Sequence, residues 1–245
     1  ILVAAVIIHY RSQLKIEDSN VRSFLVFTPV ACAGIFTLFV LVNRYRGEVN
    51  MAKALHEQSQ QHFDRMNKFV AEADNYFFPL DLTTTPLNWY RGFSFFHNQQ
   101  TDSALVYFHK AELQSPYHIQ VLNDLGACYE NKGDHIRAMQ YFDRVLQITP
   151  FYEETMLNKI VSTYNMGKVQ EAYGLLHART YQWTQFYLSC RRAIIGSVVS
   201  EVVGNGNNKA VSEKLSNDPW ISAIEEKSNG SLSKLKIVIA EEFQK

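Results

Sequence analysis

The stretch that decides the fold runs from residue 85 to residue 152 and consists of two consecutive segments of equal length. The first reads TPLNWYRGFSFFHNQQTDSALVYFHKAELQSPYH (85–118), and the second reads IQVLNDLGACYENKGDHIRAMQYFDRVLQITPFY (119–152). When the two are aligned, a glycine, an alanine, a phenylalanine and a proline recur, as Gly92 and Gly126, Ala104 and Ala138, Phe108 and Phe142, and Pro116 and Pro150. Self-similarity at a fixed period of this length indicates an array of helical repeats.

Each recurring residue has a physical role in a pair of packed helices. The glycine lets the two helices of one repeat approach closely, and alanine suits their tightest crossing. We expect the phenylalanine to fill the gap between successive repeats and the proline to end the second helix. The period and these residues resemble the tetratricopeptide repeat (TPR), and they predict three units: 85–118, 119–152 and a decayed copy at 153–182 that retains Gly167 and Ala172.

An uncharged apolar stretch precedes the repeats and reads FLVFTPVACAGIFTLFVLV (24–42). A helix of this length is about 28 Å long, which is close to the hydrocarbon thickness of a bilayer. Arg22 before it, and Arg44 and Arg46 after it, suit the two membrane–water interfaces. We therefore expect a transmembrane helix over 21–43, with the lipid bilayer as a partner of the chain. A signal peptide, which has a shorter apolar run, and a buried core helix are the alternatives.

The rest of the chain predicts further helices. The apolar run 1–8 is typical of the end of a preceding transmembrane helix, so we expect the chain to be the C-terminal part of a longer, multi-pass protein. Three basic residues on each side of the span leave its orientation open. An amphipathic connector helix is expected over 48–80 and a C-terminal helical region over 183–245. The predicted fold class is all-α, with a transmembrane helix or hairpin followed by a TPR solenoid.

Composition and motifs argue against several kinds of function. The chain has 24 basic and 24 acidic residues, and this balance argues against a nucleic-acid partner. Its three cysteines, Cys32, Cys128 and Cys190, have no metal-ligand spacing. His56-Glu57 begins like a zinc-protease motif, but position 60 holds a glutamine where the second histidine belongs. We identify no catalytic residue, expect neither metal nor cofactor, and interpret the chain as a binding module.

The surface most suited to binding is the concave face that the first helices of the TPR units line. Helix geometry points eleven side chains into this groove: Trp89, Phe93, Phe96, His97, Asn123, Ala127, Glu130, Asn131, Leu157, Tyr164 and Asn165. Aromatic rings beside asparagines suit a protein or peptide partner, or a glycan. The alternative is that several of these rings pack against the connector helix or against Phe77 and Phe78. Since Trp89 and Phe93 stand where TPRs that clamp a carboxylate tail carry lysine and asparagine, we do not expect such a clamp.

The order of several phrases resembles one family of membrane proteins. A polar helix follows the hydrophobic segment, and then come FFPLD (77–81), PLNWYRG (86–92), PYH (116–118) and VLNDLG (121–126). This order is similar to the C-terminal part of bacterial O-antigen ligases and O-antigen polymerase-like proteins that carry TPRs after their last membrane helix. The resemblance implies a parent protein in the bacterial inner membrane that transfers glycans from a lipid-diphosphate carrier. Its catalytic residues would lie in loops outside this chain.

These features support two hypotheses on function. In the first, the chain is the TPR tail of such a ligase and positions partners of the lipid-linked glycan assembly machinery. In the second, it is a membrane-tethered TPR adaptor for protein complexes unrelated to glycans. The sequence upstream of Ile1 separates the two, because further spans with a large basic loop support the first.

Overall fold

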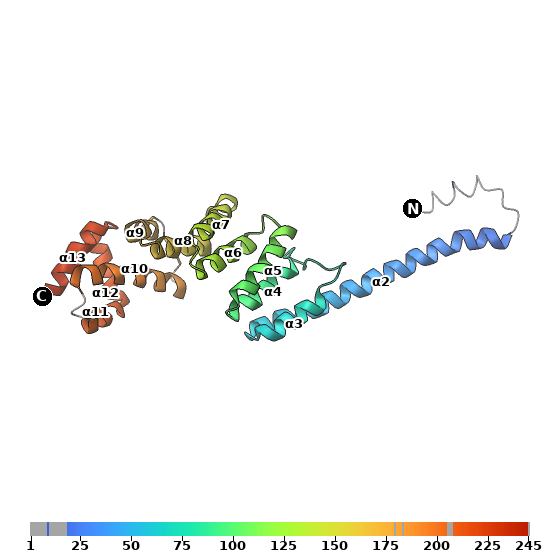
Figure 1. The fold of residues 1–245 in the computed structure, drawn as a ribbon, viewed down its shortest axis with the longest axis horizontal. Coiled ribbons are helices and arrows are strands. Elements are labelled where there is room, and N and C mark those ends of the chain that lie inside the picture. The colour runs from blue at the N-terminus through green and yellow to red at the C-terminus, as the bar shows by residue number, and fades with distance from the viewer. Residues whose placement is uncertain (1–8, 10–18, 179, 183, 205–207, 245) are drawn as a thin grey trace. The chain divides into compact units, whose positions relative to one another are not determined.

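The computed structural model describes residues 9, 19–178, 180–182, 184–204 and 208–244, and every regular element in this part of the chain is a helix (Figure 1). The predicted all-α class is therefore confirmed. The chain divides into two compact units, residues 1–90 and 91–245, each with its own packing. The expected end of a preceding membrane helix at 1–8 lies outside the described residues.

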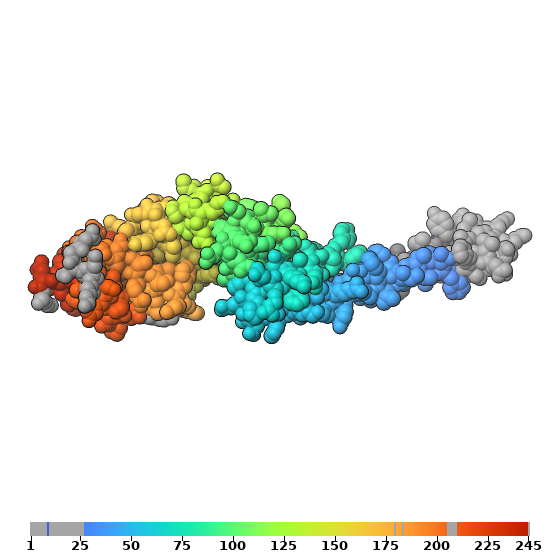
Figure 2. All heavy atoms as spheres, turned by 60° about the horizontal axis from the view of Figure 1, so that its bottom comes forward, coloured from blue at the N-terminus to red at the C-terminus, as the bar shows by residue number. Residues whose placement is uncertain are grey.

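Unit 1 is dominated by helix α2 (Ser19–Ser59), which contains 41 residues. Most of its apolar side chains between residues 27 and 42 are exposed, among them Phe27 at 69% and Ile35 at 70%, and the blue spheres of Figure 2 show part of this surface. By length and composition α2 can cross a membrane, and none of its most apolar window is buried by the protein. A buried core helix would be covered, so that alternative is excluded, whereas a signal sequence shares these properties.

The stretch 48–80, for which one connector helix was expected, contains two helices. Helix α2 continues to Ser59, and α3 (Phe63–Ala73) follows after a short turn. The turn holds Gln61 at a φ of 58°, and His62 Nδ1 lies 2.9 Å from Glu57 Oε2. Helix α3 folds back on α2 and buries one apolar face, so that unit 1 contains a helical hairpin whose core includes Met51, Ala54, Met66, Val70 and Ala73.

The repeats form successive helix pairs. They are α4 (Leu87–His97) with α5 (Thr101–Gln114), α6 (Ile119–Asn131) with α7 (His135–Ile148), and α8 (Glu153–Asn165) with α9 (Val169–His177). Helix α4 crosses the boundary between the two units. Helices α5 and α7 each end two residues before their proline, as the pattern predicts.

The turns inside the three pairs share one backbone feature. Gln99, Gly133 and Gly167 have φ angles of 61°, 75° and 77°, and they occupy the same position in three successive repeats. A residue with a left-handed backbone conformation at this point ends the first helix and reverses the chain direction into the second helix. The common turn makes the third pair a TPR-like unit in backbone as well as in sequence.

The recurring phenylalanines pack inside their own repeat. A Cβ atom placed on Gly92 would lie 2.5 Å from the ring of Phe108, and one on Gly126 would lie 2.4 Å from that of Phe142. Each phenylalanine thus fills the space that a glycine opens between the two helices of one repeat, whereas the sequence had suggested the gap between successive repeats.

After the last repeat, the described residues form four helices: α10 (Gln185–Val203), α11 (Asn208–Leu215), α12 (Asp218–Ser228) and α13 (Leu232–Gln244). Figure 1 shows α10 and α13 beside α9, and α10 also contacts α8. Leu157 of α8 and Leu176 of α9 share one core with Ile194 of α10, Ile224 of α12 and Ile239 of α13. The C-terminal helices therefore cover the apolar end of the third repeat, as a terminal cap of a solenoid does.

Candidate binding groove

A cavity of about 740 Å³ runs along the first helices of the three repeats. Its walls come from α4, α6 and α8, with one ring from α7 and further residues from the segment before α10 and from the first turn of α10. The lining residues are Phe93, Phe96, His97, Asn123, Asp124, Ala127, Glu130, Asn131, Phe142, Glu153, Glu154, Leu157, Asn158, Val161, Gln182, Thr184 and Phe186. This volume falls within the range of ordinary ligand sites.

The structure brings eight of the eleven predicted groove residues to this cavity: Phe93, Phe96, His97, Asn123, Ala127, Glu130, Asn131 and Leu157. Tyr164 and Asn165 line a separate cavity of about 340 Å³ against α10. Trp89 lies in unit 1, is 8% exposed and packs edge-on against Tyr90 with ring centroids 4.8 Å apart.

Asn123 belongs to the wall of the groove but is only 2% exposed. Its Oδ1 accepts hydrogen bonds from Thr155 Oγ1 at 2.6 Å and from Asn158 Nδ2 at 3.1 Å, while its Nδ2 donates to Glu154 Oε1 at 3.1 Å. These bonds join α6 to α8 across two successive repeats. The side chain of Asn123 thus fixes the spacing of the groove walls, and a ligand would meet its neighbours first.

Glu130 is held in a second contact between α6 and α8. Its carboxylate accepts hydrogen bonds from Ser162 Oγ and from Asn165 Nδ2, the latter at 2.6 Å, and it lies 3.0 Å from His135 Nδ1. Burial alone would raise the pKa of Glu130, but the hydrogen bonds from Ser162, Asn165 and His135 lower it overall. The groove wall therefore carries a negative charge at neutral pH.

Three further carboxylates line the groove: Asp124, Glu153 and Glu154. Glu153 Oε1 accepts from the backbone N–H of Gln182 at 3.0 Å, and Glu154 Oε2 accepts from Tyr152 Oη at 3.1 Å. These donors are neutral, so the charges of Glu153 and Glu154 are not cancelled by them. Among the described lining residues no lysine or arginine is present. The groove is electronegative.

Apolar surface lies between these carboxylates. Phe93 packs on His97 with ring centroids 4.2 Å apart, and Phe96 lies edge-on to the same imidazole at 6.0 Å. Burial lowers the pKa of His97, so this imidazole is neutral near pH 7 and adds no positive charge. Together with Phe186, which is 39% exposed, these rings give the groove apolar contact surface beside its acidic rim.

Sequence reasoning missed the acidic character of the groove. Asp124 and Asn158 occupy equivalent positions in successive repeats, and Glu154 precedes Asn158 by one helical turn, so the helix period could have placed them on the same face. Gln182, Thr184 and Phe186 could not have been found in this way, because they lie at or beyond the end of the last repeat and no periodic pattern points to them. The described residues contain no group of three or more His, Cys, Asp or Glu side chains that could hold a metal ion.

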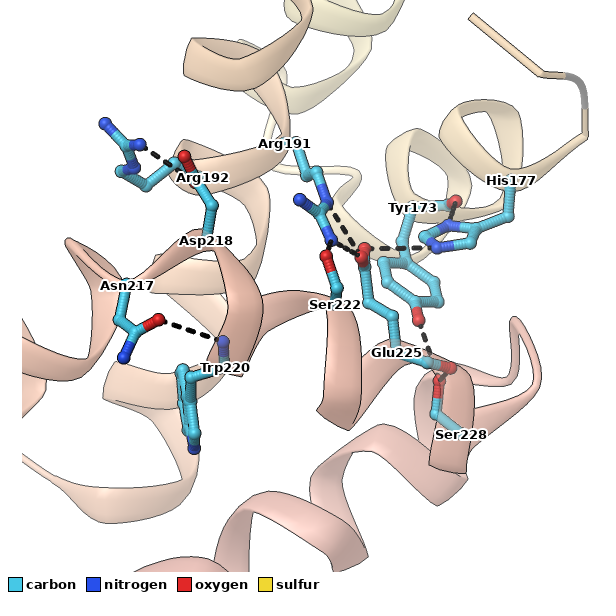
Figure 3. A network of polar contacts seen from close by, with 10 residues as sticks. All are labelled: Tyr173, His177, Arg191, Arg192, Asn217, Asp218, Trp220, Ser222, Glu225 and Ser228. Atoms are coloured by element: carbon cyan, nitrogen blue, oxygen red, sulfur yellow. Dashed lines mark hydrogen bonds and ion pairs between the residues drawn. The ribbon is translucent and has the colours of Figure 1, made fainter. Parts of the chain in front are cut away.

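A second polar cluster lies among α9, α10 and α12 (Figure 3). Arg191 is 3% exposed; its Nε donates to Glu225 Oε2 at 2.7 Å and its guanidinium also donates to Ser222 Oγ at 2.9 Å. His177 Nε2 lies 3.2 Å from Glu225 Oε1, and Tyr173 Oη lies 3.2 Å from Ser228 Oγ. This cluster joins three helices through charge-assisted bonds, and we interpret it as structural.

Comparison with known proteins places few limits on function. No protein-family model matches the chain. A segment of 42 residues is 36% identical to the uncharacterized protein MJ0572 of Methanocaldococcus jannaschii, a match that covers 17% of this chain and 49% of that protein. The chain thus spans about half the length of the curated relative it matches.

Several solved repeat structures are similar to the chain. The structure MamA MSR-1 C2 has a TM-score of 0.49 and 13% identity, over 75% of this chain and 98% of its own. A Podosopora anserina kinesin light chain protein with nearly identical TPR-like repeats has a TM-score of 0.46 and 15% identity, over 76% and 95%. At such scores the likeness carries no further argument, and the chain is a TPR-like helical repeat protein on the strength of its own period, turns and packing.

Proposed function

We propose that the chain is a membrane-anchored, TPR-like interaction module whose groove binds an extended, positively charged segment of a partner protein. The observation that carries this proposal is the lining of the groove, in which four carboxylates accompany aromatic rings and no basic residue is present among the described lining residues. Helix-lined grooves bind peptide segments through apolar anchors, with charged residues setting orientation and choice of partner.

The charges favour a cationic ligand for a simple reason. Glu153 and Glu154 are held by neutral hydrogen-bond donors, so lysine or arginine side chains of a partner would be the first positive charges to reach them. An acidic segment would instead be repelled by every charged group of the lining. Because the carboxylates are partly open to water, binding is expected to weaken as salt concentration rises.

The rings supply the second part of recognition. Phe93, Phe96 and Phe186 offer apolar surface to a side chain such as leucine or phenylalanine, and aromatic contacts of this kind dominate the energetics of many interfaces. A cation placed over the face of a phenylalanine ring gains a further attraction. The preferred segment therefore combines a large apolar residue with neighbouring lysine or arginine.

A peptide panel tests this proposal. The peptides have equal length and one phenylalanine anchor, and they differ only in carrying lysine, glutamine or glutamate at the flanking positions. Fluorescence anisotropy with the whole chain in lipid nanodiscs should give the tightest binding for the lysine series, weaker binding for glutamine and none for glutamate. Equal binding of the glutamate series, or no binding of any series, contradicts the proposal.

The anchoring part of the proposal rests on α2. Its exposed apolar surface needs a cover, and its length between Phe24 and Val42 suits a bilayer. Membrane attachment would hold the groove close to partners in or at the same membrane, which raises their effective concentration.

A more specific hypothesis concerns the parent protein. The phrase order from Phe77 to Gly126 supports an O-antigen ligase-like protein of the bacterial inner membrane, in which this groove would hold a component of lipid-linked glycan assembly. A basic segment of such a component fits the acidic groove. The alternative is an adaptor for complexes unrelated to glycans. The full reading frame distinguishes them, since a start codon directly before Ile1 with no further membrane span contradicts the ligase hypothesis.

A further inference from the structure

The loop after α3 is docked along the outer surface of α2. Asn75 Nδ2 lies 3.5 Å from the carbonyl oxygen of Asn43, and the ring of Phe78 fits against Gly47 so closely that a Cβ there would lie 2.5 Å away. Phe77 points along α2 in the other direction, with its ring edge-on to Phe39 at 5.8 Å and to Phe36 at 6.3 Å. The loop thus contacts α2 at three levels.

The shape of the loop tip is fixed by its own hydrogen bonds. Asn75 Oδ1 accepts from the backbone N–H of Phe77 at 3.0 Å, and the carbonyl oxygen of Asn75 accepts from the N–H of Phe78 at 2.9 Å. This is an asparagine turn, in which the side chain takes the place of a backbone acceptor. Tyr76 stands at its outermost point, 91% exposed, with its ring 5.2 Å from that of Phe77.

The two α2 residues that Phe77 contacts belong to the expected membrane span. Phe39 and Phe36 precede Val42, the last apolar residue of the span, by three and six positions. At 1.5 Å per residue they lie about 4.5 and 9 Å inside its end, in the outer part of the acyl-chain region. A tyrosine next to this region matches the aromatic belt of membrane proteins, and Arg44 next to the span suits the membrane–water interface.

From this geometry we infer that the Tyr76–Phe77 tip is a second membrane contact, which inserts into the interfacial layer of the bilayer beside α2 and holds the α2–α3 hairpin at the membrane surface. The inference rests on the proposed spanning role of α2. The partner that covers the Tyr76–Phe77 tip is phospholipid, because the ring of Phe77 continues the apolar surface of α2 that the bilayer would already cover. In water the same arrangement would leave Tyr76 and the flank of Phe36, itself 60% exposed, uncovered on one side of a charged hairpin.

Depth-dependent quenching tests the inference in the whole chain. The environment-sensitive fluorophore NBD is attached to Tyr76→Cys in a Cys32→Ser background; Cys128 and Cys190 are buried, and burial raises the pKa of both thiols, which keeps them unreactive. The protein is reconstituted in phosphatidylcholine liposomes with nitroxide quenchers at shallow or deep acyl positions. The matched control is Gln60→Cys in the same background, at the α2–α3 turn about 27 Å beyond Val42 along the helix.

The expected result is a blue-shifted emission at position 76 that shallow quenchers reduce more than deep ones, against a water-like, unquenched emission at position 60. A separate sample labelled at the native Cys32 reports on α2 itself and should be quenched best by the deep probe. If Cys32 is deep but position 76 is water-like, the tip inference is overturned while the membrane anchor stands. If the label at Cys32 is in water, both the membrane anchor and the tip inference are overturned. A blue shift at 76 that depends on protein concentration and not on lipid quenchers would assign the tip to a second copy of the chain and overturn the inference.

Discussion

Phe142 lies against Gly126 so closely that a methyl group on the glycine would sit 2.4 Å from the phenylalanine ring. The same relation joins Phe108 and Gly92 one repeat earlier. A short contact of this kind cannot be relieved by a rotation of the methyl group, so either the ring or one helix of the pair must move. The packing of the two helices within each of these two repeats therefore requires a glycine, which has no Cβ atom, at this position.

Gly126→Ala is expected to lower the free energy of unfolding by about 1–3 kcal/mol, because overpacking outweighs the helix propensity that alanine gains. The matched control is Gly174→Ala, also inside a repeat helix but with no atom within 4 Å of the added Cβ. It should raise stability by roughly 0.5–1 kcal/mol. Urea unfolding of both variants measures the difference, and equal effects of the two substitutions would contradict the packing account.

Gln99 occupies the turn position that glycine holds in the next two repeats. Its φ of 61° is strained for a residue with a Cβ, whereas Gly133 at 75° is not. Gln99→Gly is therefore expected to stabilise the chain by about 0.5–1 kcal/mol, and Gly133→Ala to destabilise it by a similar amount. Thermal unfolding followed by circular dichroism checks the opposite signs, and a loss of stability in Gln99→Gly would refute the shared turn geometry.

The sequence was sufficient for the repeats because their period encodes both the helix pairs and their faces. Gly92, Ala104 and Phe108 recur at the repeat period, and a helix of known pitch then points specific positions into the groove. It was not sufficient for the break between α2 and α3, since Gln60-Gln61-His62 contains neither glycine nor proline. The turn results from the tertiary packing of α3 on α2, and the helix propensities of the residues do not predict it.

Polar groups were harder to assign than apolar ones. Asn123 was expected to face a ligand, yet its partners Thr155 and Asn158 lie in the next repeat, and only the relative placement of α6 and α8 makes it a buried acceptor. Arg191 gives no sign of burial in the sequence, because its partner Glu225 lies on a different helix, far along the chain. The hydrogen-bond partners of a buried polar side chain come from tertiary contacts, and the periodicity of the sequence does not show these contacts.

The buried ion pair in the C-terminal helices makes a clear prediction. Arg191→Met leaves the carboxylate of Glu225, 12% exposed, without its main counter-charge, and we expect a loss of about 3 kcal/mol. Arg192→Met is the neighbouring control, since Arg192 is 43% exposed and its pair with Asp218 at 2.9 Å should contribute at most about 1 kcal/mol. Denaturant unfolding measures the free energy of unfolding of both variants. Equal losses in the two would contradict a larger contribution of the buried Arg191–Glu225 pair.

His177 should make stability depend on pH. Burial alone would lower the pKa of His177, but its bonds to Glu225 and to the carbonyl of Tyr173 outweigh this and the repulsion from Arg191, so its pKa is raised. A raised pKa in the folded state means that the protonated form stabilises the fold. This contribution is fully present below the unfolded value of about 6.5 and is lost as pH rises through the folded pKa.

The measurement is the difference in unfolding free energy between wild type and His177→Gln across this pH window. We expect the difference to favour the wild type most on the acidic side and to shrink towards alkaline pH. His135, which lies beside Glu130 on another pair of helices, remains unchanged in both proteins and so cancels from the difference. A difference that grows with rising pH would contradict the assigned role of His177.

The most direct test of the account is the dissociation constant of a lysine-flanked, phenylalanine-anchored peptide for three forms of the whole chain. Wild type is compared with Glu153→Gln/Glu154→Gln, which keeps the hydrogen-bond acceptors of the groove and removes two charges, and with Glu226→Gln, which removes an exposed charge from α12. With each groove charge worth roughly 0.5–1 kcal/mol, we predict about tenfold weaker binding to the double variant and no change with Glu226→Gln. Binding of equal strength to all three forms would contradict the claim that this groove recognises a cationic partner segment.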